Sequence, residues 1–213
     1  MQGLIGKKLG MTQVFDGAGA RVPVTVIEAG PCVVVQRKTK ARDGYEAVQL
    51  GFAERKEART NRAALGRFKA AGVTPRRHLA EFAVPGESPL KAGDTLTVQV
   101  LEGATHVDVT GVTRGLGFQG VVHRHGMGGG PKTHGGHSKR RIGSIGCNAF
   151  PARVHKGHRM PGHAGHARVT QQNLRVVDVR PDENLLLVQG AVPGPAGGVV
   201  LVRRALKKPG KAS

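Results

Sequence analysis

Acidic residues are missing from one long stretch of this 213-residue chain, because none occurs in the 69 residues between Asp108 and Asp178. The same stretch holds eleven Lys/Arg residues and eight of the ten histidines. Folded surfaces normally carry both signs of charge, since unopposed like charges repel one another. The pattern therefore predicts an external polyanion, and the net charge of +19 indicates nucleic acid or an anionic membrane surface.

Other scarcities narrow the class of protein. No run approaches the roughly 20 apolar residues of a membrane span. The start of the sequence has no apolar segment typical of a secretory signal, so we expect a cytosolic protein. Cys32 and Cys147 are too few for a disulfide scaffold and are expected to be reduced. Tryptophan is absent and aromatic residues make up 3%, which argues against a module that stacks single-stranded bases on sheet aromatics.

Short alternating or β-branched runs predict a mainly β domain formed by residues 1–113 and 169–205, whose closing strands pair with the opening ones. The predicted strands are Leu4–Ile5, Gln13–Phe15, Val22–Glu28, Cys32–Lys38, Tyr45–Phe52, Glu81–Val84, Thr95–Leu101, His106–Thr113, Leu174–Val179, Leu185–Gln189 and Val199–Arg203. Residues 53–80 are rich in Ala, Glu, Lys and Arg and predict an insert of one or two short charged helices.

Residues 114–168 contain fourteen glycines and no apolar periodicity of 2 or 3.6. A segment of this composition cannot form its own core, so we expect a projecting extension that is disordered or functional. Residues 206–213 are expected to form a mobile basic tail.

Two glycine motifs in this extension fit nucleotide-binding loops poorly. Gly115–Gly120 matches the dinucleotide fingerprint, but residues 121–130 are too glycine-rich for the helix that must follow, and no acidic residue comes about 20 residues later. Residues 126–133 approach a P-loop, but Pro131 replaces the second glycine and removes a backbone donor.

Three histidine pairs, His134/His137, His155/His158 and His163/His166, leave two interpretations open. They could bind zinc together with Cys147, although no nearby carboxylate would orient the imidazoles. The favoured interpretation is that they stack on bases or bond to phosphates.

Catalysis has little support, because Ser138 and Ser144 lack the strand–turn–helix setting of a hydrolase nucleophile. We therefore expect no enzyme, cofactor, metal or small-molecule substrate. A DNA-compacting protein remains an alternative, since it would use the same charge.

Several blocks together resemble the bacterial form of the large-subunit ribosomal protein L3 family, from the first residue to about Leu206. They are Gly3–Gln13 (GLIGKKLGMTQ), Gly117–Gly120 (GFQG) with Arg124, Gly143–Gly146 (GSIG), Lys156–His163 (KGHRMPGH), Leu185–Val188 (LLLV) and Gly190–Gly194 (GAVPG). Each block is modest alone, but their order and spacing are highly specific.

The resemblance implies a translation-protein-type β-barrel with a small charged helical insert and a long extension that penetrates the large ribosomal subunit. It implies a barrel against the 3′-terminal region of the large rRNA, an extension tip near the peptidyl-transferase centre, and a part in early assembly. The implied partners are rRNA and neighbouring ribosomal proteins, in the cytoplasm and away from membranes.

Basic residues and histidines are expected to contact rRNA, and residues 143–151 to form the tip. The expected contacts are Lys7, Lys8, Arg114, His123, Arg124, His125, Lys132, His134, His137, Lys139, Arg140, Arg141, Arg153, Lys156, His158, Arg159 and Arg168. The tip residues are Gly143, Ser144, Ile145, Gly146, Cys147, Asn148, Phe150 and Pro151.

Two positions depart from the family pattern. Many bacterial members have a glutamine, methylated in some species, where this chain has Cys147, so we expect no methylglutamine. Members commonly have a basic residue where this chain has Leu116, which puts one phosphate contact in doubt.

Overall fold

The structure is a computed structural model that describes residues 3–84 and 89–208. The chain divides into two compact units, Met1–Val112 with Arg168–Ser213, and Thr113–Ala167. No helix in the described ranges is long and apolar enough to cross a lipid bilayer. Of the expected basic tail, residues 209–213 lie outside the described residues.

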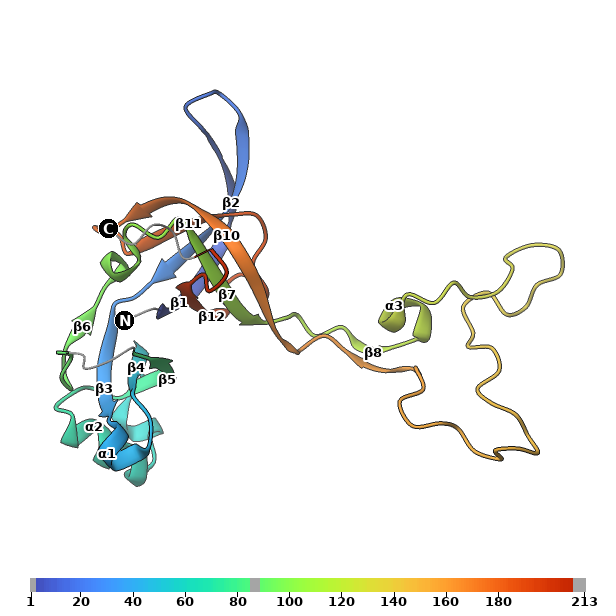
Figure 1. Cartoon of the computed structure of the whole chain (residues 1–213), viewed down its shortest axis with the longest axis horizontal. Coiled ribbons are helices and arrows are strands. Elements are labelled where there is room, and N and C mark those ends of the chain that lie inside the picture. The colour runs from blue at the N-terminus through green and yellow to red at the C-terminus, as the bar shows by residue number, and fades with distance from the viewer. Residues whose placement is uncertain (1–2, 85–88, 209–213) are drawn as a thin grey trace. The chain divides into compact units, whose positions relative to one another are not determined.

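Six antiparallel strands of the first unit close into a barrel, which confirms the mainly β fold (Figure 1). Around the barrel the order is β1-β12-β7-β10-β11-β2. The strands are β1 (Gly3–Phe15), β2 (Arg21–Ala29), β7 (His106–Val112), β10 (Arg168–Arg180), β11 (Leu185–Gln189) and β12 (Val199–Arg204). Strand β12 pairs with β1 and β11 with β2, so the predicted pairing of closing and opening strands is confirmed.

A second sheet in the same unit has four strands in the order β5-β4-β3-β6. They are β3 (Cys32–Lys38), β4 (Ala47–Glu54), β5 (Arg76–Ala83) and β6 (Thr95–Leu96). Short helices occur in its connections, namely α1 (Lys40–Asp43), η1 (Glu57–Arg59) and α2 (Arg62–Ala70). Asn61 caps the N-terminus of α2, because its side chain accepts a hydrogen bond from the Ala64 amide at 2.8 Å. The strand pattern alone did not separate this sheet from the barrel.

One apolar cluster joins the barrel to the second sheet. It contains barrel residues such as Leu4 and Val202 together with Val34 and Leu50 of the second sheet, all with no exposed surface. Burying each such side chain stabilises the fold by about 1.5–3 kcal/mol. Gly6 permits the close approach of the paired strands β1 and β2, because a Cβ there would lie 2.7 Å from the Glu28 carbonyl oxygen.

Cys32 belongs to this cluster as a buried, free thiol. Its sulfur donates to the Ile5 carbonyl oxygen at 3.2 Å. Burial raises the pKa of the Cys32 thiol to about 11, so it packs as a small protonated side chain.

Two local predictions were wrong. Residues 76–80 belong to strand β5 and not to the charged helices. Residues Val98–Leu101 form the 3₁₀ helix η2, in which Val98 and Leu101 turn one face into the core, and not the end of a strand. The glycine-rich extension also contains three short regular elements, β8 (Gly117–Gln119), α3 (Val121–His125) and β9 (Gly162–Ala164).

Candidate nucleic-acid interface

The second unit begins and ends with two paired segments. The Thr113 amide donates to the Ala167 carbonyl and the Leu116 amide to the Ala164 carbonyl, both at 2.9 Å. Strands β8 and β9 continue this antiparallel pairing, with Gly117 opposite Ala164. The unit therefore starts as a hairpin whose long connection, residues 120–161, carries most of its charge.

Helix α3 fixes one predicted contact residue inside this connection. The Arg124 Nη1 atom donates to the Met160 carbonyl oxygen at 2.8 Å, and Nε2 of His125 lies 3.1 Å from the same oxygen. Gly162 leaves room for the guanidinium, since a Cβ there would lie 2.5 Å from Nη1. Arg124 thus joins the two ends of the connection, and its remaining N–H groups are exposed.

Seven cations of the connection are exposed, and among the described residues none has a side-chain hydrogen bond or an ion pair. They are Lys132, Lys139, Arg140, Arg141, Arg153, Lys156 and Arg159. Arg114 is exposed and equally unpaired. Because this unit has no carboxylate, its cations repel one another until an anion binds.

The backbone of the connection turns through close crossings that need glycine. At Gly129, with φ +76°, a Cβ would collide with the Lys139 carbonyl oxygen, while the Gly130 amide donates to that oxygen at 3.0 Å. At Gly136 a Cβ would lie 2.5 Å from the Pro131 carbonyl oxygen. Gly129 and Gly136 thus let the backbone pass close to Lys139 and Pro131, respectively.

The histidines of this unit are spread along it. Those predicted to contact rRNA, His123, His134, His137 and His158, are exposed, and His125 is half-buried. Within residues 3–84 and 89–208, no three His, Cys, Asp or Glu side chains lie close enough to hold a metal ion.

The predicted tip, residues 143–151, is an exposed loop around Phe150, whose side chain is 87% exposed. Ser144 Oγ donates to the Gly146 carbonyl at 3.0 Å and holds the turn. Cys147 is an exposed free thiol. The exposed Phe150 ring offers a stacking surface for a base.

Three predicted contacts lie in the first unit. Lys7 and Arg168 are exposed, but Lys8 is buried. The Lys8 ammonium donates to the carbonyls of Val192 and Gly194 at 2.8 and 3.1 Å. This side chain therefore holds the barrel together and does not present its charge to an external phosphate.

Comparison with known proteins decides the family. A family model described as Ribosomal protein L3 matches residues 87–184. The large ribosomal subunit protein uL3 of Acidothermus cellulolyticus is 53% identical, over 100% of this chain and 96% of that protein. The uL3 protein of Pelotomaculum thermopropionicum is 52% identical, over 98% of this chain and 99% of that protein. The uL3 protein of Brachyspira pilosicoli is 46% identical, over 99% of this chain and 97% of that protein.

The chain belongs to the ribosomal protein L3 family. The resemblance seen in the sequence blocks is therefore confirmed. The unit Thr113–Ala167 is the candidate for the long extension that the family resemblance implies. The barrel is formed by the two segments that flank this unit.

The sequence pointed to no functional residue of this L3 protein in the four-stranded sheet. The structure nevertheless gathers Arg55, Lys56, Arg59, Arg77 and His78 around one concave surface. The available signal was three basic residues close in sequence, Arg55, Lys56 and Arg59. Arg77 and His78 are brought near them only by the pairing of β4 with β5.

Proposed function

We propose that this protein binds the rRNA of the large ribosomal subunit and consolidates that contact with the unit Thr113–Ala167. As a member of the L3 family it is a structural constituent of the large subunit and not an enzyme. In bacteria the large subunit lies in the cytoplasm, with rRNA and other ribosomal proteins as its components.

One observation carries the RNA-binding proposal: seven exposed, unpaired cations in a unit without a carboxylate. Arginine presents a planar fork to phosphate and lysine a point charge. Glycine-supported turns let the backbone approach ribose and phosphate closely. These features favour a segment that runs between structured RNA helices.

The family resemblance supports three finer proposals. The barrel contacts the 3′-terminal region of the large rRNA and helps to nucleate assembly of the subunit. The loop 143–151 approaches the peptidyl-transferase centre. The residues proposed to touch rRNA are those predicted above except Lys8, whose ammonium is bonded inside the barrel.

A salt titration of binding to a large-subunit rRNA fragment, with duplex DNA as competitor, tests the proposal. If the seven cations each neutralise a phosphate, log Kd against log salt changes with a slope of about 5 to 6, at roughly 0.7–0.9 for each contact. Replacing Lys139, Arg140 and Arg141 by Gln lowers that slope by about 2 to 3. A slope near 1, or equal affinity for duplex DNA, contradicts the proposal.

A further inference from the structure

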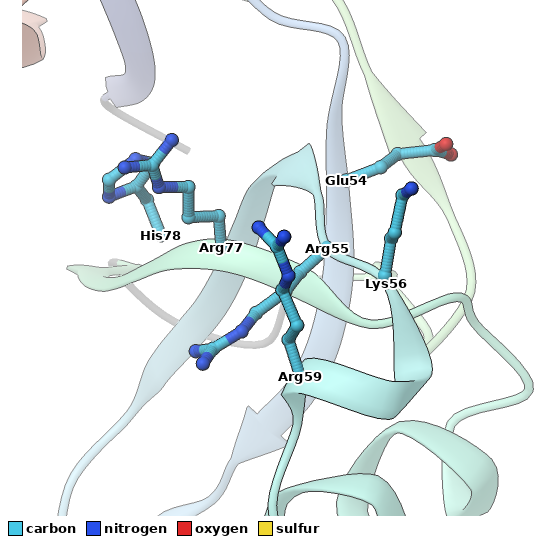
Figure 2. A pocket seen from close by; sticks show the side chains of 6 residues that line it. All are labelled: Glu54, Arg55, Lys56, Arg59, Arg77 and His78. Carbon is cyan, nitrogen blue, oxygen red and sulfur yellow. The ribbon is translucent and has the colours of Figure 1, made fainter.

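A concave surface on the four-stranded sheet is lined by four cations, one histidine and one carboxylate (Figure 2). It encloses about 530 Å³ and is formed by Glu54, Arg55, Lys56, Arg59, Arg77 and His78. Glu54 ends β4, and Arg77 and His78 lie on β5. The connection that contains η1 carries Arg55, Lys56 and Arg59. We call this surface the β4–β5 pocket.

Backbone hydrogen bonds hold the pocket in place. Antiparallel pairing sets Phe52 opposite His78. The Arg55 amide donates to the Pro75 carbonyl at 2.9 Å, and the Arg59 amide to the Lys56 carbonyl at 3.0 Å. The cations therefore project from a fixed turn and a paired strand, so less conformational entropy is lost when an anion binds.

Most of the positive charge in the pocket is unneutralised. Glu54 is its one carboxylate, and it is shared with Arg76 Nη1 at 3.4 Å and Thr74 Oγ1 at 3.5 Å. In Figure 2, Glu54 and Lys56 extend away from Arg77 and His78.

Among the described residues, four lining cations have neither an ion pair nor a side-chain hydrogen bond. They are Arg55, Lys56, Arg59 and Arg77. Their charge is available to an external anion.

The pKa of His78, the histidine of the pocket, is lowered for two reasons. Burial lowers the pKa of His78, and the neighbouring charge of Arg77 lowers it further. His78 is thus mainly neutral at pH 7 and adds a hydrogen-bonding nitrogen rather than a fifth charge.

The chemistry of the lining indicates the kind of partner. Protein interfaces place aromatic and apolar anchors at their centre and deplete charge there, and small-molecule pockets are mostly apolar. None of the six residues that line this pocket is apolar. Nucleic-acid interfaces, by contrast, are polar and strongly positive.

We propose that the β4–β5 pocket binds backbone phosphates of large-subunit rRNA. This contact would be separate from that of the glycine-rich connection, because the pocket belongs to the unit that contains the barrel. The inference rests on the proposed rRNA binding. Arg55, Arg59 and Arg77 would bind adjacent phosphates, with His78 bonding to a phosphate oxygen or a ribose hydroxyl.

The test compares two full-length variants with equal loss of charge. One replaces Arg55, Arg59 and Arg77 by Gln. The control replaces Lys40, Arg62 and Lys69 by Gln, because these cations are exposed on the same part of the fold but do not line the pocket. Thermal unfolding verifies that both variants fold.

The pocket variant should lose about 2 to 3 from the slope of log Kd against log salt on rRNA fragments, while the control keeps the wild-type slope. Hydroxyl-radical footprinting should show one protected RNA segment lost in the pocket variant and retained in the Lys139/Arg140/Arg141→Gln variant. In the wild type, RNA binding should raise the NMR-monitored pKa of His78.

The outcomes separate the two proposals. If wild type does not select rRNA, the proposed function fails. If wild type selects rRNA but the pocket variant matches the control in slope and footprint, the pocket proposal alone is overturned. Unchanged RNA binding together with lost affinity for another ribosomal protein would assign the pocket to a protein partner and would also overturn it.

Discussion

The ammonium of Lys8 donates a 2.8 Å hydrogen bond to the backbone carbonyl of Val192, a residue 184 positions later in the chain. The Gly194 carbonyl accepts a second bond from the same nitrogen. Lys8 lies on the first barrel strand and is only 9% exposed, and its acceptors lie in the loop before the last strand. A buried ammonium needs such acceptors, so these bonds join the beginning of the barrel to its end.

Replacing Lys8 by Met keeps most of the apolar stem and removes both bonds. We expect the free energy of unfolding to fall by about 1.5–3 kcal/mol, the usual contribution of hydrogen bonds to a charged group. Lys7→Met, at an exposed neighbour, should change stability by no more than about 0.5 kcal/mol. Urea unfolding of the two variants checks this, and equal stabilities would show that the Lys8 bonds contribute nothing net.

Asp108 holds an irregular part of strand β10. Its Oδ1 accepts from the Asn173 amide at 2.9 Å, where Asn173 has φ +56° and the register with β7 shifts. The carboxylate is 2% exposed and also lies 3.6 Å from Arg203 Nε.

Asp108→Ala leaves the Asn173 amide without its acceptor, and we expect a loss of about 1–3 kcal/mol in unfolding free energy. Asp178→Ala is the matched control, because Asp178 forms an exposed pair with Arg180 worth at most about 1 kcal/mol. Thermal denaturation of both variants measures the difference. A larger loss in the control would contradict the role assigned to Asp108.

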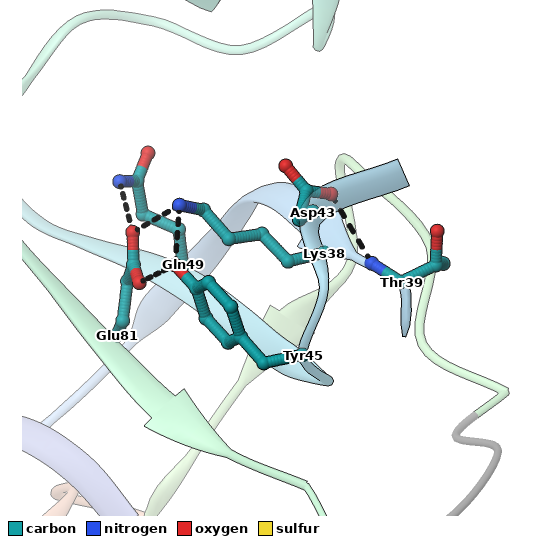
Figure 3. A network of polar contacts seen from close by, with 6 residues as sticks. All are labelled: Lys38, Thr39, Asp43, Tyr45, Gln49 and Glu81. Carbon is teal, nitrogen blue, oxygen red and sulfur yellow. Dashed lines mark hydrogen bonds and ion pairs between the residues drawn. The ribbon is translucent and has the colours of Figure 1, made fainter. Parts of the chain in front are cut away.

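A polar network crosses strands β3, β4 and β5 of the second sheet (Figure 3). Lys38 Nζ lies 3.0 Å from Glu81 Oε1 and donates to the Tyr45 hydroxyl at 2.6 Å. That hydroxyl donates to Glu81 Oε2 at 2.8 Å, and Gln49 Nε2 to Glu81 Oε1 at 3.3 Å. The bond from Lys38, followed by those from Tyr45 and Gln49, holds the pKa of Glu81 below its ordinary value.

This shift predicts a pH-dependent contribution of Glu81 to stability. A lowered folded-state pKa stabilises the protein above the unfolded pKa, near 4.5, and the stabilisation is lost as the pH falls through the folded pKa. Glu81→Gln should therefore be less stable than wild type at pH 7, with a gap that closes below about pH 4.5. Glu183→Gln, at an exposed carboxylate, should show no such gap, and a Glu81 gap independent of pH would contradict the network.

The glycine-rich connection should gain order from RNA. Few backbone hydrogen bonds occur between residues 127 and 159, among them Gly136 to Thr133 and His158 to His155. Too few contacts offset its ordering entropy, so we expect nearly unprotected amides there in the free protein. Hydrogen exchange should show protection only after rRNA is added, and strong protection without RNA would contradict this.

The barrel was predictable because alternating apolar residues record which face of a strand is buried. Strand β12 shows this directly, since Val200 and Val202 are buried while Val199 and Leu201 are half-buried. The second sheet was not predictable as a separate layer, because local patterns do not state which distant strand is the partner. The prediction at Val98–Leu101 failed because Leu96, Val98 and Val100 alternate with polar residues as in a strand. The structure instead places Val98 and Leu101, three residues apart, on one face of a 3₁₀ helix.

The basic connection could be recognised from composition, since charge without counter-charge is visible in any sequence. Lys8 could not be distinguished from Lys7, because only the closed barrel reveals that one ammonium faces two carbonyls and the other faces solvent. Arg59 and Arg77 are likewise separated in sequence, and the β4–β5 pairing that brings them to one pocket is a property of the fold.

We propose that the barrel unit selects the rRNA site and that the glycine-rich connection consolidates the contact. The most direct measurement replaces residues 120–161 by a short Gly-Ser linker, which closes the hairpin between the paired residues Gln119 and Gly162. Binding to 3′-terminal large-subunit rRNA fragments is then measured against duplex DNA for the intact and the shortened chain. We expect both chains to select the same rRNA fragment over DNA, and the shortened chain to bind it more weakly. Loss of all selectivity in the shortened chain, or equal affinity of the intact chain for DNA, would contradict it.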